Sequence, residues 1–187
     1  LDDQGSSSNP CSETYRGTSP FSESETQAVK NFVEQRDFKI AMNYHSYSNL
    51  LIYPFGYSYE NNMDQDDLNT FIEYAQDMTQ YNNYVWGTGP DILYPVNGEA
   101  CDWMYGEHGI FAYTPEVGNS SDGFWPPTNR IVPLAEENLY PNIRTALYAG
   151  ALVSSIINIE AGPYTSDDSY SIDISLANTG LSPTNGN

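Results

Sequence analysis

Positively charged side chains are scarce in this 187-residue sequence. Lysine and arginine together number 6, against 25 aspartates and glutamates, so the formal net charge is -19 at pH 7. A surface of that sign repels nucleic-acid phosphates and anionic membranes, and we expect neither as a partner. The chain is also poor in lysine and rich in tyrosine, serine, asparagine and aspartate. That balance favours a secreted, extracellular protein of bacterial type.

Long hydrophobic runs and common cofactor motifs are also missing. The longest apolar run, ALYAGALVSSII at 146–157, is interrupted by serines and falls short of the ~20 residues that span a bilayer. The absence of HExxH, CxxC pairs, a P-loop and GxGxxG argues against the common metalloproteases, zinc ribbons and nucleotide-binding proteins. Only two cysteines occur, Cys11 and Cys101, and the sequence leaves open whether they pair with each other.

The segments with regular periodicity alternate between helix and strand. Helical spacing of apolar residues predicts helices over 22–36, over 65–81 and over 134–157, the first opened by a capping box of Ser22 and Glu25. Alternating apolar residues predict strands over 38–45 and 110–114. A chain of this length can bury roughly 70% of its unfolded surface. The order of elements therefore predicts an α/β fold with a layered sheet.

Two ionisable residues stand at the carboxyl ends of the predicted strands. His45 ends the first strand, and Glu116 follows Pro115, which we expect to terminate the second because proline cannot donate to a ladder. In open α/β sheets, ligands bind outside the carboxyl ends of strands. A single histidine there is more often a structural residue than a metal ligand, and a glutamate after a strand is usually solvated. Their shared placement favours a functional site.

The composition changes near residue 160. From Gly162 onward helical periodicity disappears, turn residues accumulate, and YSIDISLANTG alternates like a strand. We expect one folded unit over residues 1–160. Residues 161–187 are expected to form a linker and the start of a β-sandwich accessory region.

Four stretches together resemble a known family. NPCSETYRG, FKIAMNYHSYSNLLIYPFGY, LYPVNGEACDWMYGEHGIFAYTPE and GFWPPTNRIVP resemble, in order and spacing, the second half of a zinc metallocarboxypeptidase of the carboxypeptidase A/T family. The likeness extends from residue 5 to about 158. It implies a mixed central sheet flanked by helices, incomplete at its N-terminal side, so that 1–160 is the C-terminal portion of a catalytic domain.

The resemblance also implies roles for individual residues. His45 matches the second histidine of the family's zinc site, where two histidines and a glutamate bind the metal. Glu116 matches the general base, which takes a proton from zinc-bound water and passes it to the leaving amine. Tyr94 matches a tyrosine that swings over the C-terminal residue of the substrate. Ser46 and Tyr47 match positions that line the subsites across the scissile bond, and family members have a non-proline cis peptide between them.

Cys101 corresponds to the base of the family's specificity pocket. An acidic residue there would select basic C-terminal residues, whereas a cysteine is small and normally neutral. Cys101 therefore favours neutral or apolar C-terminal side chains, and the nearby Glu99 counts against that preference.

Part of the family's machinery is missing from these residues. The first zinc motif, His-x-x-Glu, does not occur, and no arginine matches those that hold the substrate's terminal carboxylate. We expect the parent protein to be a zinc-dependent metallocarboxypeptidase that removes C-terminal amino acids from peptides and proteins. This chain alone is expected to be an inactive fragment whose partner is the missing N-terminal half.

Two further expectations depend on the resemblance. The alternative function is a non-catalytic, carboxypeptidase-like module that binds peptide termini, and a His-x-x-Glu motif in the preceding gene sequence would exclude it. Calcium is expected beside zinc, because relatives of the carboxypeptidase T type often bind it and this chain has many carboxylates. No EF-hand spacing assigns calcium a position.

Overall fold

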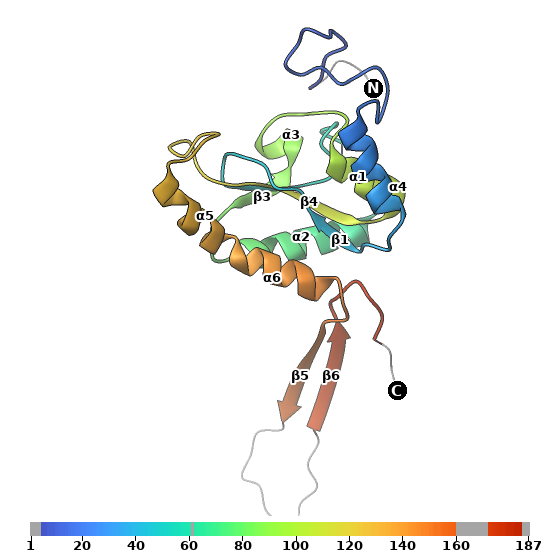
Figure 1. Ribbon diagram of the computed structural model, residues 1–187. Coiled ribbons are helices and arrows are strands. Elements are labelled where there is room, and N and C mark those ends of the chain that lie inside the picture. Colours follow the sequence, from blue (N-terminus) through green and yellow to red (C-terminus); the bar gives the residue numbers. More distant parts are fainter. Residues whose placement is uncertain (1–4, 61, 160–171, 185–187) are drawn as a thin grey trace, which may run out of the picture. The chain divides into compact units, whose positions relative to one another are not determined.

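The computed structural model describes residues 5–60, 62–159 and 172–184 (Figure 1). The chain divides into two compact units, Leu1–Thr145 and Ala146–Asn187, which are considered separately. No helix in the described ranges is long and apolar enough to cross a membrane.

The first unit is built around a four-stranded mixed sheet. Its order is β1 (Ile40–Met42), β4 (Phe111–Glu116), β2 (Leu50–Tyr53) and β3 (Val85–Thr88). β1 runs parallel to β4, β4 runs antiparallel to β2, and β2 runs parallel to β3. This confirms the predicted mixed sheet, and it makes β1 and β3 the two edge strands.

Helices cover both faces of the sheet. On one face, α1 (Ser24–Glu34) and α4 (Ala100–His108) contribute Val33, Cys101 and Met104 to a cluster with Ile110 and Ala112 of the β4 region. Three further helices are the one-turn α3 (Gly89–Ile92), α5 (Ile131–Glu137) and α6 (Leu139–Tyr148). A 3₁₀ turn at Thr128–Arg130 directly precedes α5.

The opposite face is covered by α2 (Gln65–Thr79). Its Phe71 is fully buried, and its ring packs tilted against Phe111 and edge to face against Tyr113, with centroids 4.7 and 5.2 Å apart. Asp64 caps the helix by accepting a hydrogen bond from the Asp66 N–H, as suits an acidic first turn. The prediction of a helix over 65–81 is confirmed to within two residues.

Pro115 does not end its strand, so that prediction was wrong. β4 continues through Glu116 because its other edge pairs with β2, where Leu51 lies opposite Pro115 and Leu50 opposite Glu116. Because proline has no N–H, one hydrogen bond is missing between β4 and β1 instead. Regular pairing of β1 accordingly stops at Met42, well before the predicted end of the strand.

The first predicted helix is shorter than expected. α1 begins at Ser24 with Glu23 as its N-cap residue, and the Ser22 hydroxyl bonds Glu23 Oε1, so no capping box forms. Val33 is the only buried residue of α1, while Val29 and Phe32 are 49% and 52% exposed.

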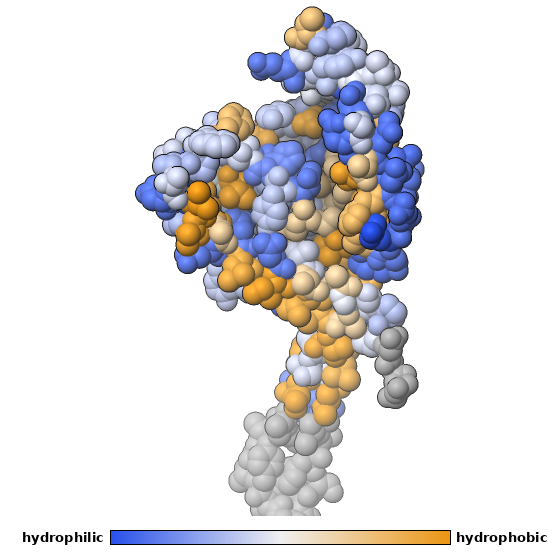
Figure 2. Space-filling model, viewed as in Figure 1, coloured by the Kyte–Doolittle hydropathy of each residue, from blue (hydrophilic) through white to orange (hydrophobic). Residues whose placement is uncertain are grey.

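The single helix predicted over 134–157 was also wrong. α5 and α6 are separate helices that meet at Asn138, and the chain leaves helical structure after Tyr148. Leu139 and Ile143, apolar residues of α6, are 59% and 50% exposed. Figure 2 shows the resulting hydrophobic strip over α5 and α6.

The second unit contains an antiparallel ribbon of β5 (Val153–Ile159) and β6 (Ile172–Asn178). The register places Ile157 opposite Ile174, and Val153, Ile157, Ile174 and Leu176 are 51% to 70% exposed. β6 confirms the strand predicted from YSIDISLANTG. Most of the predicted linker, residues 160–171, lies outside the described residues, and the β-sandwich remains a prediction.

Candidate active site

His45 and Glu116 are neighbours at the carboxyl ends of β1 and β4. The His45 N–H donates to the Pro115 carbonyl, and the Val117 N–H donates to the His45 carbonyl, each with an N···O distance of 2.8 to 3.0 Å. These two bonds enclose Glu116 in a parallel bridge with His45. Residues paired across adjacent strands emerge on the same face of the sheet. The structure therefore brings together the two ionisable residues that the sequence placed at matching strand ends.

The carboxyl group of Glu116 is largely withdrawn from water. The residue is 9% exposed, and burial raises the pKa of its carboxyl group above the ordinary value. The nearby His45 imidazole partly opposes that rise in pKa, and the carboxylate of Glu99 adds to it. A carboxylate with a raised pKa holds a proton more readily than an exposed one does, as a general base requires.

The imidazole of His45 is exposed and has one side-chain hydrogen-bond partner among the described residues. Asn43 Nδ2 lies 3.2 Å from His45 Nε2. One ring nitrogen thus has a polar partner, and the other is available to a ligand. No group of three or more histidine, cysteine, aspartate or glutamate side chains is placed to hold a metal among the described residues.

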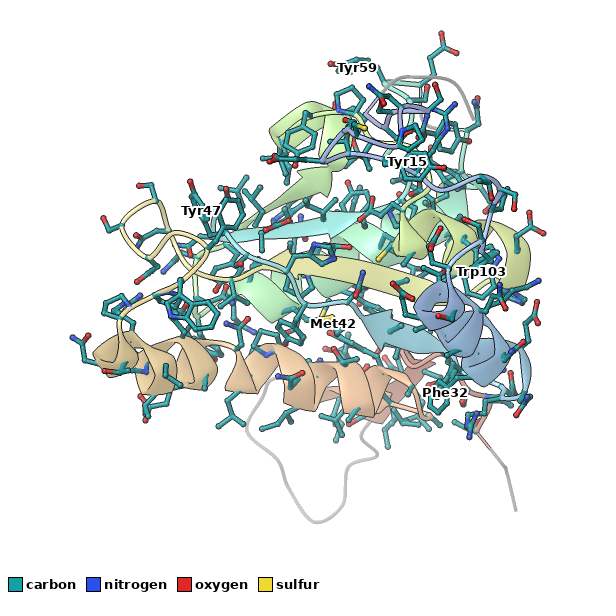
Figure 3. All side chains as sticks on the ribbon, turned by 45° about the horizontal axis from the view of Figure 1, so that its top comes forward. Tyr15, Phe32, Met42, Tyr47, Tyr59 and Trp103 are labelled. Carbon is teal, nitrogen blue, oxygen red and sulfur yellow. The ribbon has the colours of Figure 1, made fainter. Side chains whose placement is uncertain are left out.

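Ser46 and Tyr47 follow His45 in a sharp turn. The peptide bond between them is cis, as the resemblance implied, and a second non-proline cis bond joins Pro54 and Phe55. The Tyr47 ring meets that of Phe124 edge to face, with centroids 4.9 Å apart. Figure 3 shows Tyr47 beside the loop that follows β4.

A partly buried ion pair fixes the loop that carries Phe124. Arg130 Nε and Nη2 donate to the two carboxylate oxygens of Asp122 at 2.6 and 3.1 Å, and the Asn119 N–H also donates to Asp122. The guanidinium holds the pKa of the Asp122 carboxyl below its ordinary value. This two-point contact holds the loop whose Phe124 ring meets Tyr47.

Cys101 lies on the same face of the sheet as Glu116 but is hidden. It is 1% exposed, and its Sγ lies 3.0 Å from Oγ1 of Thr114, which is two residues before Glu116 on β4. The Thr114 hydroxyl in turn donates to Glu99 Oε1 at 2.7 Å. Burial raises the pKa of the Cys101 thiol, which keeps it neutral. Both cysteines have free thiols, so Cys11 and Cys101 do not pair with each other.

Asp102 supports the loop after β2. Its two carboxylate oxygens accept the Gly56 N–H at 2.9 and 3.0 Å. Burial raises the pKa of Asp102 to about 7, and the backbone N–H of Gly56 partly opposes the rise. No motif in the sequence singles out this acid, although it directly follows Cys101.

Tyr94 lies apart from the His45 and Glu116 pair. It follows α3 on the surface, where it is 59% exposed, and its side chain bonds neither residue in the structure described. His108, the other histidine, sets its ring 4.7 Å from that of Trp103 on α4, so its contacts are structural.

The comparisons with known proteins agree with this geometry. Residues 1–141 match the family model for zinc carboxypeptidases. The chain belongs to the zinc carboxypeptidase family. It is 39% identical over 146 residues to zinc carboxypeptidase A 1 of Anopheles gambiae, an alignment that covers 73% of this chain and 34% of the mosquito protein. Over 143 residues it is 35% identical to carboxypeptidase B of Astacus astacus, covering 73% and 47% of the two chains.

Solved zinc carboxypeptidase-fold structures are similar as well. Bovine thrombin-activatable fibrinolysis inhibitor, solved in complex with tick carboxypeptidase inhibitor, superposes with a TM-score of 0.69 at 30% identity. That superposition covers 78% of this chain and 51% of the bovine chain. This chain spans only about a third to a half of the length of the curated relatives it matches.

Zinc fits the described residues only in part. A catalytic zinc site normally has three protein ligands and an open position for water. The resemblance matches one residue, His45, to a zinc ligand, and the described residues contain no three-residue metal group. Of the other acids on this side of the sheet, Glu99 accepts the Thr114 hydroxyl and Asp102 accepts the Gly56 N–H. A complete zinc site therefore requires ligands other than these.

Proposed function

We propose that this chain carries the C-terminal portion of the catalytic domain of a zinc-dependent metallocarboxypeptidase. Its substrates would be peptides and proteins, from which it removes C-terminal amino acids. The observation that supports this most directly is the bridge between His45 and Glu116, with a buried, pKa-raised carboxyl group beside an exposed imidazole. Family membership supplies the reaction class.

Glu116 is the proposed general base. Because its pKa is raised, the carboxyl group can accept a proton from a water molecule that attacks the scissile carbonyl and later donate it to the leaving amine. Its position at the strand end, enclosed by the backbone of His45, limits its motion. Ser46 and Tyr47 are the proposed contacts for substrate residues before the scissile bond. Tyr94, exposed on its loop, is the proposed cover for the C-terminal residue.

His45 is the proposed zinc ligand from this chain. Zinc, when bound, would supply Lewis acidity toward the substrate carbonyl and water. The remaining ligands would come from a polypeptide equivalent to the rest of the relatives' length, which is the proposed partner of this chain. The chain alone is accordingly proposed to be inactive. Calcium binding remains an expectation with no position assigned to it.

The proposed function is tested by mass and activity together. Denatured intact mass of the purified material shows whether species other than the 20.9 kDa chain are present. Peptidase activity that accompanies a second species, is lost on chelation and returns with zinc would support the proposal. Chelator-sensitive activity from a single 20.9 kDa species would contradict the inactivity of the fragment.

A non-catalytic binding module is the second candidate, favoured by the absence of a full ligand set in the described residues. It predicts that peptides with a free C-terminal carboxylate bind but are not cleaved, even when the whole gene product is assembled with zinc. Glu116→Gln distinguishes the two candidates: it would abolish cleavage by a peptidase and leave binding by a module nearly unchanged.

An extracellular location is also proposed, supported by the acidic, lysine-poor composition. Fractionation of the source cells with an antibody against this chain would test it. Recovery from the washed cell interior alone would contradict it.

A further inference from the structure

The backbone directly after Glu116 is held from both sides of the sheet. The Val117 N–H donates to the His45 carbonyl at 3.0 Å, and the Gly118 N–H donates to the Tyr84 hydroxyl. His45 follows β1 and Tyr84 directly precedes β3, and these two strands lie on opposite sides of β4. The place of the Glu116 carboxyl group therefore depends on what fixes the residues that follow it.

The next N–H along the chain is held by the buried Asp122. The Asn119 N–H donates to Asp122 Oδ2 at 3.0 Å, and the Asp122 N–H donates to the Asn119 carbonyl at 2.9 Å, so that residues 119–122 close a tight turn. Gly118 has a φ of +88°, and a Cβ added there would come within 3.1 Å of Asp122 Cβ. The positive φ favours glycine, and the close approach leaves little room for a side chain. Asp122 thus packs against the backbone two residues after Glu116.

Arg130 holds the Asp122 carboxylate in this position. Its Nε and Nη2 donate to the two carboxylate oxygens at 2.6 and 3.1 Å, and the Asp122 side chain is 4% exposed. A two-point guanidinium contact fixes the direction of a carboxylate and also compensates the cost of burying its charge. Arg130 ends the 3₁₀ turn that leads into α5, so the segment after β4 is tied to that helix (Figure 1). No step of the proposed reaction uses this buried, charged side chain directly.

We propose that Asp122 is a positioning residue for Glu116 in the peptidase reaction. Asp122 holds the Asn119 N–H and packs against Gly118, so the backbone leaves β4 along one path and the Glu116 carboxyl group keeps one place beside His45. The proposal rests on the proposed role of Glu116 as general base. A displacement of about 1 Å in a reacting group can lower a rate on the order of 100-fold. Asp122 acts through the backbone and contacts no substrate atom.

The first test measures the backbone of this chain without requiring activity. Asp122→Ala removes the acceptor within the turn, and hydrogen exchange of the Val117 amide should become at least about 10-fold faster. The Phe111 amide, bonded to the Lys39 carbonyl at the other end of β4, should keep its rate. Equal acceleration of both amides would show a general loss of stability, and an unchanged Val117 amide would show that Asp122 does not hold the strand end. Either result would overturn the proposal.

Asp122→Asn separates the hydrogen bond in the turn from the ion pair. Asparagine can present its amide oxygen to the Asn119 N–H and to Arg130, but it carries no charge. Exchange of the Val117 amide in this variant should therefore stay within about 3-fold of the parent rate. Exchange as fast as in Asp122→Ala would mean that the bond to Asn119 does not fix the strand end, and would contradict the proposed path.

The second test uses the assembled peptidase with zinc. In Asp122→Ala, kcat should fall about 10- to 100-fold while KM changes less than about 2-fold, because a displaced base weakens the transition state more than substrate binding. Asp122→Asn should recover kcat to within about 5-fold of the parent. Asp122→Ser, whose hydroxyl is one bond too short to replace the carboxylate, takes the place of the alanine variant if that variant does not fold. Asp77→Ala is the matched control: Asp77 of α2 also pairs with an arginine, Arg144, and its loss should lower Tm without changing kcat.

The outcomes separate this proposal from the one on which it rests. An unchanged kcat in folded Asp122→Ala or Asp122→Ser, or an equal fall of kcat in Asp77→Ala, would overturn the positioning role and leave the carboxypeptidase function intact. A parent assembly that cleaves no peptide when loaded with zinc would overturn the carboxypeptidase function, and with it the positioning role, whatever the exchange rates are.

Discussion

The two faces of strand β4 differ in chemistry. Toward α2, Phe111 and Tyr113 meet the fully buried Phe71 in an aromatic cluster. Toward α4, Thr114 and Glu116 are buried as polar groups, linked to acids and a thiol. Because successive side chains of a strand point to opposite faces, β4 contributes both to the aromatic cluster and to the buried polar groups. The comparison indicates that the buried polar groups of β4 are confined to the α4 face, while its large aromatic rings lie on the α2 face.

The largest expected effect is on the aromatic face. Phe71→Ala removes a completely buried ring and should lower the free energy of unfolding by about 3 to 5 kcal/mol. Phe32→Ala on α1 is the control, because that ring is 52% exposed and its loss should cost under about 1 kcal/mol. Urea unfolding midpoints measure both changes. Equal losses would show that the α2 face is not the main source of stability.

On the polar face, Asp102 should make stability depend on pH. Burial raises its pKa from 3.8 to about 7, so the folded protein keeps a proton that the unfolded chain releases. The contribution of Asp102 to stability is therefore greatest below pH 4 and falls as the pH rises to 7, by about 4 kcal/mol for a pKa difference of about 3.

Asp102→Asn isolates that contribution, because it retains an acceptor for the Gly56 N–H but cannot ionise. The difference in unfolding free energy between variant and parent should grow in favour of the variant between pH 4 and 7. A difference that stays constant with pH would show that Asp102 keeps an ordinary pKa.

Glu116→Gln should have a smaller effect on stability of the same sign. The pKa of Glu116 is raised by burial, and the His45 imidazole partly opposes the rise. The variant should therefore be more stable than the parent at pH 8 and equally stable at pH 3, where both side chains are neutral. Thermal unfolding at the two pH values measures this. A loss of stability at pH 8 would mean that attraction to His45 outweighs the cost of burial.

The smallest effect is expected from zinc. With one proposed ligand, the isolated chain should gain less than about 0.5 kcal/mol from 100 μM zinc. His45→Ala should remove what gain there is, as measured by zinc-dependent shifts in Tm. A gain of several kcal/mol that requires His45 would show that the chain completes a metal site by itself.

The parts of the fold that follow from local patterns could be predicted from the sequence. The apolar alternation that ends at His45, the helix of α2 and the position of Glu116 at a strand end all emerge from periodicity and turn chemistry. Their relative placement also followed, because the carboxyl ends of parallel strands meet at one edge of a sheet.

What could not be predicted depends on contacts between distant residues. Pro115 stays in its strand because β2 pairs with the other edge of β4, and no local signal reports that pairing. β3 was not predicted at all, because four residues that include Gly87 carry little periodicity. The Thr114 contact of Glu99 crosses 15 residues of chain and becomes evident only after α4 packs on β4. The break at Asn138 was hidden by a continuous helical pattern on both sides of it.

The position of β1 at the edge of the sheet affects how fast its backbone amides exchange with solvent. The N–H groups of Asn43 and His45 are bonded to β4, so the pleat directs those of Met42 and Tyr44 outward. Backbone amides along this strand should therefore exchange with deuterated solvent in alternation, slow at odd positions and fast at even ones. When another strand pairs with this edge, the even positions should slow to match the odd ones. The exchange pattern of these few amides thus reports directly whether the sheet has gained a neighbouring strand.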